Sequence, residues 1–438
     1  MSDMIPRTLR HRIRGLAMHY PVVLVTGARQ TGKTTLLHQT FPDAPFVTLD
    51  LPSVAHEAET NGMGFIESFG DATCILLDEI QYAPSLFRFL KIAVDADRHC
   101  MGRFLMTGSQ KFALMQSVSE SLAGRCAILE MDTLSSNEVC DALGPDAPKL
   151  ENFLWRGGFP ELWRAQDMMP RDFYASYLAT YLERDVRQLV NVGSLRDFER
   201  FIRVCAQRSG NLVNLNSIAS DVGIAGTTAK QWLSVLETSN IVHLLPPYFH
   251  NHGKRLIKTP KLYFKDTGLL CFLLGISSPG QMTESPFIGA IWETFILGQL
   301  HRQREASASP AEVFFWRDAQ GTEVDFAVWL NGRLQLIEVK WAESVTDSRV
   351  LYPMHTVRGD LGDSAADRHL LVTRTPTDHW HPHDPSVRVV NGYTFRDWFS
   401  VSDPPSFVLR ETPAEYKVTY AKPKRRYKKR AVKRKPMM

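Results

Sequence analysis

The chain has 438 residues, of which 44% are hydrophobic and 22% are charged, and its formal net charge is +4. This composition is that of a globular protein with room for two or three domains. No apolar run approaches the roughly 18–20 residues that a membrane span needs, and the N-terminus lacks the apolar core of an export signal. The six cysteines are scattered without a C-x-x-C pair, which predicts a reducing cytoplasm and neither a disulfide framework nor a structural zinc site. We therefore expect a cytoplasmic protein without a membrane segment.

The first chemical motif lies between a predicted strand, "VVLVT" at 22–26, and a predicted helix, "TTLLHQTF". The connecting loop fits the P-loop pattern G-x-x-x-x-G-K-[ST] in the strand-to-helix context that this pattern requires. Its glycines let backbone amides face phosphate oxygens, and the helix N-terminus adds positive potential. We expect ATP here, with Lys33 at the β- and γ-phosphates and the Thr34 hydroxyl on Mg²⁺. The predicted nucleotide-binding residues are Gly27, Ala28, Arg29, Gln30, Thr31, Gly32, Lys33, Thr34 and Thr35.

Two further apolar runs end in polar residues. "TCILLDEI" at 73–80 predicts a buried parallel strand with two acids at its carboxyl end, where doubly wound sheets bind ligands. Asp78 would hold Mg²⁺, and Glu79 would orient and deprotonate the attacking water. "RFLMTGSQ" at 103–110 predicts a neighbouring strand, and we select Ser109 at its end as the sensor of the γ-phosphate.

Hydrolysis also requires positive charge near the transferred phosphoryl group. Arg125, in "SLAGRCAILEM", precedes another apolar strand and is the candidate for an arginine finger supplied by a neighbouring subunit. Arg29 inside the P-loop is the weaker candidate. An ordinary surface arginine is an equal alternative at either position.

The order of these motifs resembles a known family. "GARQTGKTTLL", "LLDEIQYAPSLFRFLK", "LMTGSQKF", "SLAGR", "GGFPE" and "YLERDV" are similar to motifs of a widespread prokaryotic family of AAA+-related P-loop ATPases. The resemblance covers residues from about 5 to about 400. It implies a P-loop domain, a winged helix and a C-terminal domain of uncertain function, and it leaves the biological substrate open.

The middle of the chain has helical spacing. "RDFYASYLATYLERDVRQLV" indicates a lid or linker helix, and residues 212–245 indicate helix, glycine turn, helix and strand, with Thr227 or Thr228 as the N-cap of the second helix. Two strand-like runs around "HNHGKR" complete a winged helix. The residues predicted to face DNA are Lys230, Gln231, Lys254 and Arg255. Protein docking and an ATPase lid are the alternatives for this unit.

The C-terminal third holds a second constellation. Residues 314–344 indicate three strands, and period-two alternation places Glu323 with Asp325, and Glu338 with Lys340, on shared faces. With Glu293 on the preceding helix, the pattern D-x₁₂-E-x-K resembles the PD-(D/E)XK nuclease fold. The resemblance implies that Asp325 and Glu338 bind Mg²⁺, that Lys340 positions or activates water, and that Glu293 assists. A half-exposed sheet with alternating charges is the alternative, and a fold of this kind that binds without cleaving is another.

Two remaining segments carry charge or imidazole groups. His379, His381 and His383 have a spacing compatible with a metal site, but Pro382 and the lack of strand character favour a surface loop. Residues 417–438 contain eleven Lys and Arg and no acid, which predicts a disordered tail able to bind nucleic acid by counterion release. A solvated tail without a partner is the alternative.

The expected fold class is α/β, with an AAA+-like parallel sheet, a helical and winged-helix region, and a nuclease-like α/β domain. The expected domains are an ATPase domain (1–145), a helical linker (146–210), a winged helix (211–265), a nuclease-like domain (266–402) and a basic tail (403–438). The leading hypothesis is an ATPase that uses Mg²⁺ and acts on, or is regulated by, nucleic acid, most simply DNA, and that forms homo-oligomers. The alternative is a signalling or scaffold ATPase that switches protein–protein contacts and has an inactive C-terminal domain.

Overall fold

A computed structural model describes residues 4–109, 118, 121–181, 195–249, 258–345 and 347–399. The chain divides into two compact units, residues 1–399 and 400–438, and every described residue belongs to the first. The basic tail, Lys254, Arg255 and the segment 182–194 lie outside the described residues.

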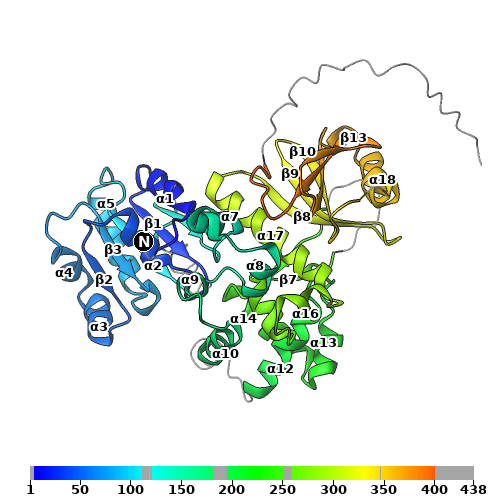
Figure 1. Cartoon of the computed structure of the whole chain (residues 1–438). Helices are drawn as coiled ribbons and strands as arrows, with labels where there is room; N and C mark the ends of the chain where they lie inside the picture. Colours follow the sequence, from blue (N-terminus) through cyan, green and yellow to red (C-terminus); the bar gives the residue numbers. More distant parts are fainter. Residues whose placement is uncertain are drawn as a thin grey trace, which may run out of the picture. The chain divides into compact units, whose positions relative to one another are not determined.

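The N-terminal region contains a five-stranded parallel sheet in the order β2-β3-β4-β1-β5 (Figure 1, blue to cyan). Its strands are β1 (Val22–Thr26), β2 (Phe46–Thr48), β3 (Ile75–Asp78), β4 (Phe104–Gly108) and β5 (Cys126–Glu130). All residues of β1 are buried, as expected for a central parallel strand covered on both faces. The predicted parallel α/β sheet of a P-loop protein is confirmed.

Helices cover both faces of this sheet. Leucine and isoleucine side chains of α1 (Leu9–Ala17) and α2 (Lys33–Thr40) pack on one face. The other face is covered by α3 (Pro52–Thr60), α4 (Gly62–Glu67) and α5 (Leu86–Ala96), with the short 3₁₀ turn η1 (Ile80–Tyr82) after β3. The carboxyl ends of β1, β3 and β4 are therefore the open edge at which the P-loop and the acidic residues meet.

The next region is helical, as predicted. It contains α7 (Ser136–Leu143), η2 (Gly144–Asp146), α8 (Leu150–Arg156), α9 (Pro160–Arg164), α10 (Pro170–Tyr181) and α12 (Leu195–Ala206). The local sequence fixes the start of α7, because Ser135 and Glu138 form a reciprocal capping box.

A helix-turn-helix unit follows, with α13 (Leu215–Val222), α14 (Gly226–Thr238) and an antiparallel pair of β6 (Val242–Leu245) and β7 (Lys261–Phe264). Asn214 caps the start of α13, and Gly223 ends it in the left-handed conformation. The predicted N-cap of α14 is wrong. The helix already begins at Gly226 after Ala225, which caps without a side-chain bond, so Thr227 and Thr228 lie inside its first turn.

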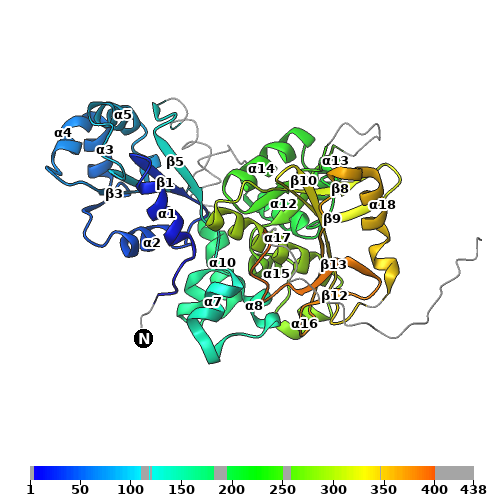
Figure 2. The same cartoon turned by 90° about the horizontal axis from the view of Figure 1, so that it is seen from above.

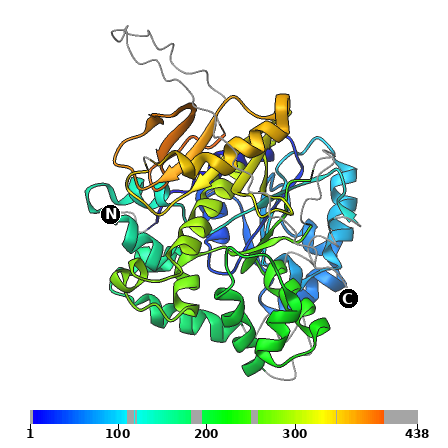
Figure 3. The same ribbon diagram turned by 90° about the vertical axis from the view of Figure 1, so that its right-hand side faces the viewer.

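The C-terminal region contains a six-stranded mixed sheet in the order β12-β13-β11-β10-β9-β8 (Figures 2 and 3, yellow to orange). Its strands are β8 (Glu312–Arg317), β9 (Glu323–Leu330), β10 (Arg333–Val339), β11 (His369–Thr373), β12 (His379–His381) and β13 (Asp384–Asn391). The first three form an antiparallel meander, whereas β11 runs parallel to β10. The three predicted strands of this segment are confirmed.

Two helices sandwich the C-terminal sheet. Apolar residues of α17 (Ile288–Ser307) pack on one face, and those of α18 (Tyr352–Leu361) pack on the other (Figure 2). The remaining short helices are α15 (Thr267–Leu273), α16 (Pro279–Thr283), η4 (Ser348–Leu351) and η5 (Gly362–Ser364). The core that includes α17 continues into α8, α10 and the helix-turn-helix unit, so the middle and C-terminal regions share one hydrophobic core.

Candidate functional site

The P-loop occupies residues 27–34 directly after β1. Gly27 has a φ of +151°, and a Cβ there would lie 2.1 Å from the carbonyl oxygen of Met131, so only glycine fits. The Lys33 side chain is buried, and its Nζ donates to the carbonyl oxygens of Gly27 (3.0 Å) and Ala28 (2.8 Å). The loop thus wraps around its own lysine at the N-terminus of α2.

The predicted magnesium ligands lie together. The Thr34 hydroxyl donates to Asp78 Oδ1 at 2.6 Å, and the Thr107 hydroxyl donates to the same oxygen at 2.5 Å. Because β4 lies between β1 and β3, the end of each strand contributes one of these groups or the loop that carries it. Hydroxyl and carboxylate oxygens are the donors that Mg²⁺ prefers, so Thr34 and Asp78 fit that ion. Thr107 was not selected from the sequence, although it ends a predicted strand.

Glu79 and Ser109 are also brought together. The Ser109 hydroxyl donates to Glu79 Oε2 at 3.2 Å, and Gln81 donates from its amide to both side chains. Glu79 has a φ of +54°, a strained conformation for a non-glycine residue of the kind that concentrates at functional sites. Its backbone amide donates to the Thr107 hydroxyl (3.1 Å), which helps to hold that conformation.

The two candidate arginines differ in position. Arg29 donates to the Tyr82 hydroxyl at 3.3 Å, beside the acidic end of β3. Arg125 precedes β5, and its carbonyl accepts from the amide of Val22 at the start of β1. Arg125 therefore lies at the amino-terminal end of the parallel strands, whereas the P-loop lies at their carboxyl end. The Arg125 guanidinium forms two bonds to Asp95, at 2.8 and 3.0 Å. Arg125 therefore does not reach the nucleotide site of its own chain.

The C-terminal constellation also converges. Lys340 Nζ lies 2.6 Å from Glu338 Oε1 and 3.7 Å from Asp325 Oδ2. Glu293 on α17 accepts from the Tyr263 hydroxyl at 2.9 Å and interacts electrostatically with Asp325 and Lys340. Two residues of β7, Lys261 and Tyr263, thus belong to a site that the sequence placed wholly on α17, β9 and β10.

The strands are irregular next to this site. Phe315 of β8 faces both Asp325 and Phe326, because the register between β8 and β9 shifts by one residue there, and such bulges re-aim side chains. The ladder between β9 and β10 ends at Ile337, beyond which β10 pairs only with β11. In place of the ladder, Asp325 Oδ2 accepts from the amide of Val339 at 2.8 Å.

The crowding of buried carboxylates changes their proton affinities. Burial, and then the neighbouring Asp325 charge, raise the pKa of Glu338 to about 8. The same two causes raise the pKa of Glu293 to about 7. Burial alone would lower the pKa of Lys340, but Asp325 and Glu338 outweigh it and raise that pKa.

Asp325 and Glu338 fit a divalent cation by one further observation. Glu338 Oε2 is buried and has no hydrogen-bond partner within the described ranges, and an unpaired buried carboxylate oxygen is costly. Among all the residues that the structure describes, there is no group of three or more His, Cys, Asp or Glu side chains arranged to hold one metal ion. Any ion here would have two carboxylate ligands.

The exposed face of α14 carries little charge. Lys230 and Gln231 are exposed, as predicted for nucleic-acid contacts, but so is Glu237 on the same helix. Lys230 and Glu237 themselves line a groove of about 840 Å³, whose other lining residues are partly apolar, such as Leu212 and Leu233, and partly polar, such as Asn214 and Asn216.

The prediction of a surface loop at His379, His381 and His383 is wrong for the first two of these residues. His379–His381 forms the edge strand β12, which pairs with β13, because a bulge at Trp380 and His381 allows the turn through Pro382. His381 is buried, whereas His379 is exposed. No helix among the described residues is long and apolar enough to cross a membrane.

The P-loop geometry separates the roles of Lys33 and Glu79. Replacing Lys33 by Ala removes the cation held at the loop and should weaken ATP binding by about 10–100-fold. Glu79→Gln keeps Thr34 and Asp78, so it should retain ATP affinity while turnover falls by about 100-fold or more. Fluorescent-nucleotide titration and phosphate release measure the two effects. Wild-type turnover in Glu79→Gln would refute the role of Glu79.

The raised pKa of Glu338 predicts a pH dependence of stability. The folded chain binds more protons than the unfolded chain between about pH 4.5 and about pH 8, so this carboxyl lowers stability as pH rises through that window. Glu338→Gln removes the effect. Its melting temperature, minus that of the wild type, should increase from about pH 5 to about pH 8.5 in the presence of a chelator. The exposed Glu312 provides the control Glu312→Gln, and a difference for Glu338→Gln that stays flat would contradict the prediction.

Sequence comparison assigns families to three parts of the chain. Residues 19–140 match the model described as an AAA domain. Residues 108–280 and 288–379 match two domains of unknown function, DUF8612 and DUF4143. The P-loop, Asp78 and Glu79 all lie in the AAA match, so the N-terminal region is an AAA-type P-loop domain, the kind of domain that binds and hydrolyses ATP.

Longer matches exist to whole proteins. The uncharacterized protein Rv2008c of Mycobacterium tuberculosis is 34% identical over 382 residues, which are 86% of this chain and 82% of that protein, and Mb2031c of Mycobacterium bovis matches equally. Among solved structures, the Walker-type ATPase PABY2304 of Pyrococcus abyssi aligns with a TM-score of 0.44 and 15% identity over 62% of this chain and 96% of that one. This structural likeness is too remote to bear on function. On the sequence matches, the chain is a P-loop protein with an AAA domain and belongs to the family that includes the mycobacterial proteins Rv2008c and Mb2031c.

Proposed function

We propose that this protein is an ATPase that acts on nucleic acid, and that its C-terminal carboxylate site hydrolyses phosphodiester bonds with a divalent metal. The observation that carries the proposal is the convergence of Asp325, Glu338 and Lys340 at the fork between β9 and β10, with Glu338 Oε2 left without a protein partner among the described residues.

The topology around these residues supports a nuclease-like domain. Helix α17 precedes an antiparallel meander of β8, β9 and β10, and α18 then crosses to β11, which is parallel to β10. The acidic residue of the second strand and the E-x-K of the third strand meet at one place. This arrangement agrees with the PD-(D/E)XK pattern read from the sequence.

Each residue of this site has a defined role in the proposal. Asp325 and Glu338 hold Mg²⁺, which would lower the pKa of bound water and stabilise charge on the phosphate. The Lys340 side chain is partly exposed, and its ammonium, which lies beside Glu338, orients water and a phosphate oxygen in this proposal. Glu293, which is bonded to Tyr263, acts on the site through Asp325.

The nucleotide site has a separate set of roles. Lys33 and the P-loop amides bind the ATP phosphates, and Thr34 and Asp78 hold the Mg²⁺ that accompanies ATP. Glu79 orients the attacking water. Ser109 bonds to Glu79 and acts as the sensor that aligns this carboxylate with the γ-phosphate.

Two further features support a nucleic-acid partner. The sequence of residues 417–438, with eleven basic residues, favours salt-dependent binding to phosphates. The helix-turn-helix unit with its strand pair has the element order of a winged helix, in which α14 would be the recognition helix. Lys230 and Gln231 are the exposed residues of α14 that would face DNA.

A second candidate function is a scaffold ATPase that switches protein–protein contacts. The observation that favours it is the balance of Lys230 by Glu237 on the exposed face of α14, together with the mixed apolar and polar lining of the groove that both residues share. In this case the C-terminal domain would be inactive and would only recognise a partner.

The cleavage proposal predicts a metal-dependent nuclease. Purified full-length protein with Mn²⁺ should cut at least one of linear, circular or single-stranded DNA or RNA. Asp325→Asn and Glu338→Gln should each lower the rate by about 100-fold or more, because loss of a direct ligand should exceed the 10–100-fold cost of losing an outer-shell partner. ATP hydrolysis should persist in both variants.

The matched control is Glu312→Gln, an exposed carboxylate of the same sheet, which should cut normally. Intact substrates under all conditions, with and without ATP, would refute cleavage. A steep fall of nucleic-acid affinity with salt would still favour a nucleic-acid partner, whereas negligible affinity would favour the scaffold.

Oligomer formation would give Arg125 a role. We propose that Arg125 of one subunit reaches the nucleotide of its neighbour, which requires it to leave Asp95. Arg125→Ala should then lower turnover by about 100-fold or more, while Asp95→Ala, which breaks the same ion pair, should not. Equal rates for both variants, measured by phosphate release, would reduce Arg125 to a structural role.

A further inference from the structure

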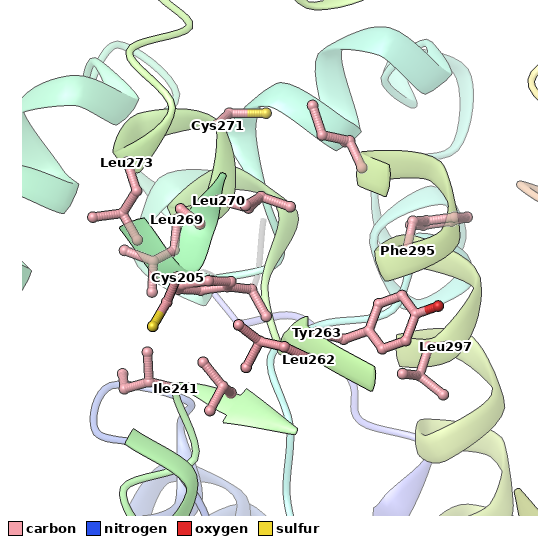
Figure 4. Packing of buried hydrophobic residues seen from close by; sticks show 14 of the residues in the cluster. Cys205, Ile241, Leu262, Tyr263, Leu269, Leu270, Cys271, Leu273, Phe295 and Leu297 are labelled. Carbon is pink, nitrogen blue, oxygen red and sulfur yellow. The ribbon is translucent and has the colours of Figure 1, made fainter. Parts of the chain in front are cut away.

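Strand β7 inserts two side chains beside the C-terminal carboxylates. Lys261 is 2% exposed and forms an ion pair with Glu323. Tyr263 is fully buried and donates to Glu293 Oε2 at 2.9 Å. Figure 4 shows Tyr263 projecting from its strand toward the helix that carries Phe295 and Leu297, which is α17.

The hairpin that carries β7 is fixed to the C-terminal sheet. The chain after β6 runs along β8, where the amide of Tyr248 donates to the carbonyl of Phe315 (2.7 Å) and Phe315 donates to Pro246 (3.2 Å). Tyr248 also packs on Trp316 and Trp329. Lys261 therefore reaches the carboxylates from an anchored strand.

The carboxylates form two pairs with different partners. The pair next to β7, called here the inner pair, is Glu293 and Glu323, which are bonded by Tyr263, and by Lys261 and Arg317, respectively. The pair farther from β7, called the outer pair, is Asp325 and Glu338, which contact Lys340 and the Val339 amide. Glu338 Oε2, in the outer pair, is the carboxylate oxygen of this site that lacks a partner within the described segments.

Charge explains why the inner pair needs a cation. Neighbouring carboxylates disfavour one another's charged form unless a cation lies near them, and the buried Lys261 ammonium interacts with Glu293 and Asp325 as well as with Glu323. Two-metal phosphodiesterase sites place their ions about 3.5–4 Å apart and share carboxylates between them. Here the volume next to the inner carboxylates already holds an ammonium.

We propose that Lys261 is the built-in counter-ion of the inner pair, so that the C-terminal site takes one divalent cation, at the outer pair, and not two. The inference rests on the proposed function for the outer pair and adds its metal stoichiometry. It makes Lys261 and Tyr263 positioning residues of the carboxylate site, contributed by the hairpin of the helix-turn-helix unit.

Counting bound Mn²⁺ tests this inference. Full-length protein carrying Asp78→Asn, which removes a ligand of the P-loop ion, is titrated without nucleotide, and free Mn²⁺ is measured by electron paramagnetic resonance. We expect one Mn²⁺ per chain. Glu338→Gln should weaken it by about 100-fold or more, as loss of a direct ligand, whereas Glu293→Gln, which acts only through Asp325, should weaken it by about tenfold.

Replacing the lysine gives the sharper result. Lys261→Met leaves the inner carboxylates without a cation, so a second Mn²⁺ should bind, and this ion should raise the melting temperature of the variant more than that of the parent. Adding Glu293→Gln to Lys261→Met should remove the second ion. Lys261→Arg keeps the charge and should bind one Mn²⁺.

The outcomes separate the two proposals. Two Mn²⁺ in the parent protein, or loss of binding in Glu293→Gln as severe as in Glu338→Gln, would overturn the role of Lys261 alone. A Lys261→Met protein that folds, melts lower and binds no second ion would do the same. If Lys261→Met does not fold, the Glu293→Gln arm decides. A parent protein that binds no Mn²⁺ contradicts the proposed metal site itself.

Discussion

One buried carboxylate, Asp266, holds the nucleotide-binding domain and the rest of the chain together. It accepts from the Thr133 hydroxyl after β5, from the amide of Gly158, and from the Tyr174 hydroxyl on α10, while it caps the N-terminus of α15. A buried charge is tolerated only when its oxygens are satisfied. The segments that supply these donors must therefore keep their relative positions. Only glycine fits at Gly157 and Gly158, since a Cβ on either residue would collide with these partners.

The same stretch of chain reaches both candidate sites. Lys261 and Tyr263 contact the C-terminal carboxylates, and Lys265, two residues beyond Tyr263, pairs with Glu130 and Asp132 at the end of β5. Arg7 completes the connection, because it donates to the carbonyls of Thr31 in the P-loop (2.8 Å) and Asp132 (2.7 Å). The six residues 261–266 thus link the P-loop region and the C-terminal carboxylates through direct polar contacts.

Local patterns predicted which groups meet beside the P-loop, because each of these groups follows a buried strand. The carboxyl ends of parallel strands lie on the same side of their sheet, so the strand ends alone predict that Thr34, Asp78 and Ser109 lie close together. The error at Thr227 and Thr228 has a local cause, since the N-cap of α14 is Ala225, two residues before the first of these threonines. The error at His379 has a tertiary cause, since the edge strand β12 exists only by pairing with β13. Arg7 and Thr107 were missed because neither belongs to the P-loop pattern or to the acidic pair.

The sequence by itself determined the P-loop, the acidic end of β3, the helix-turn-helix and the E-x-K strand. These depend on spacing along one element or across one turn, where the periods of helix and strand decide which side chains share a face. Only the tertiary structure decided which groups meet across elements. The shift in register opposite Phe315 directs Asp325 toward β10. The ion pair with Asp95 keeps Arg125 at the amino-terminal end of the strands, away from its own P-loop. The β6–β7 hairpin, which is anchored on β8, brings Lys261 to the carboxylates. Such contacts join residues tens to hundreds of positions apart, and they arise because buried charges must find partners wherever packing brings them.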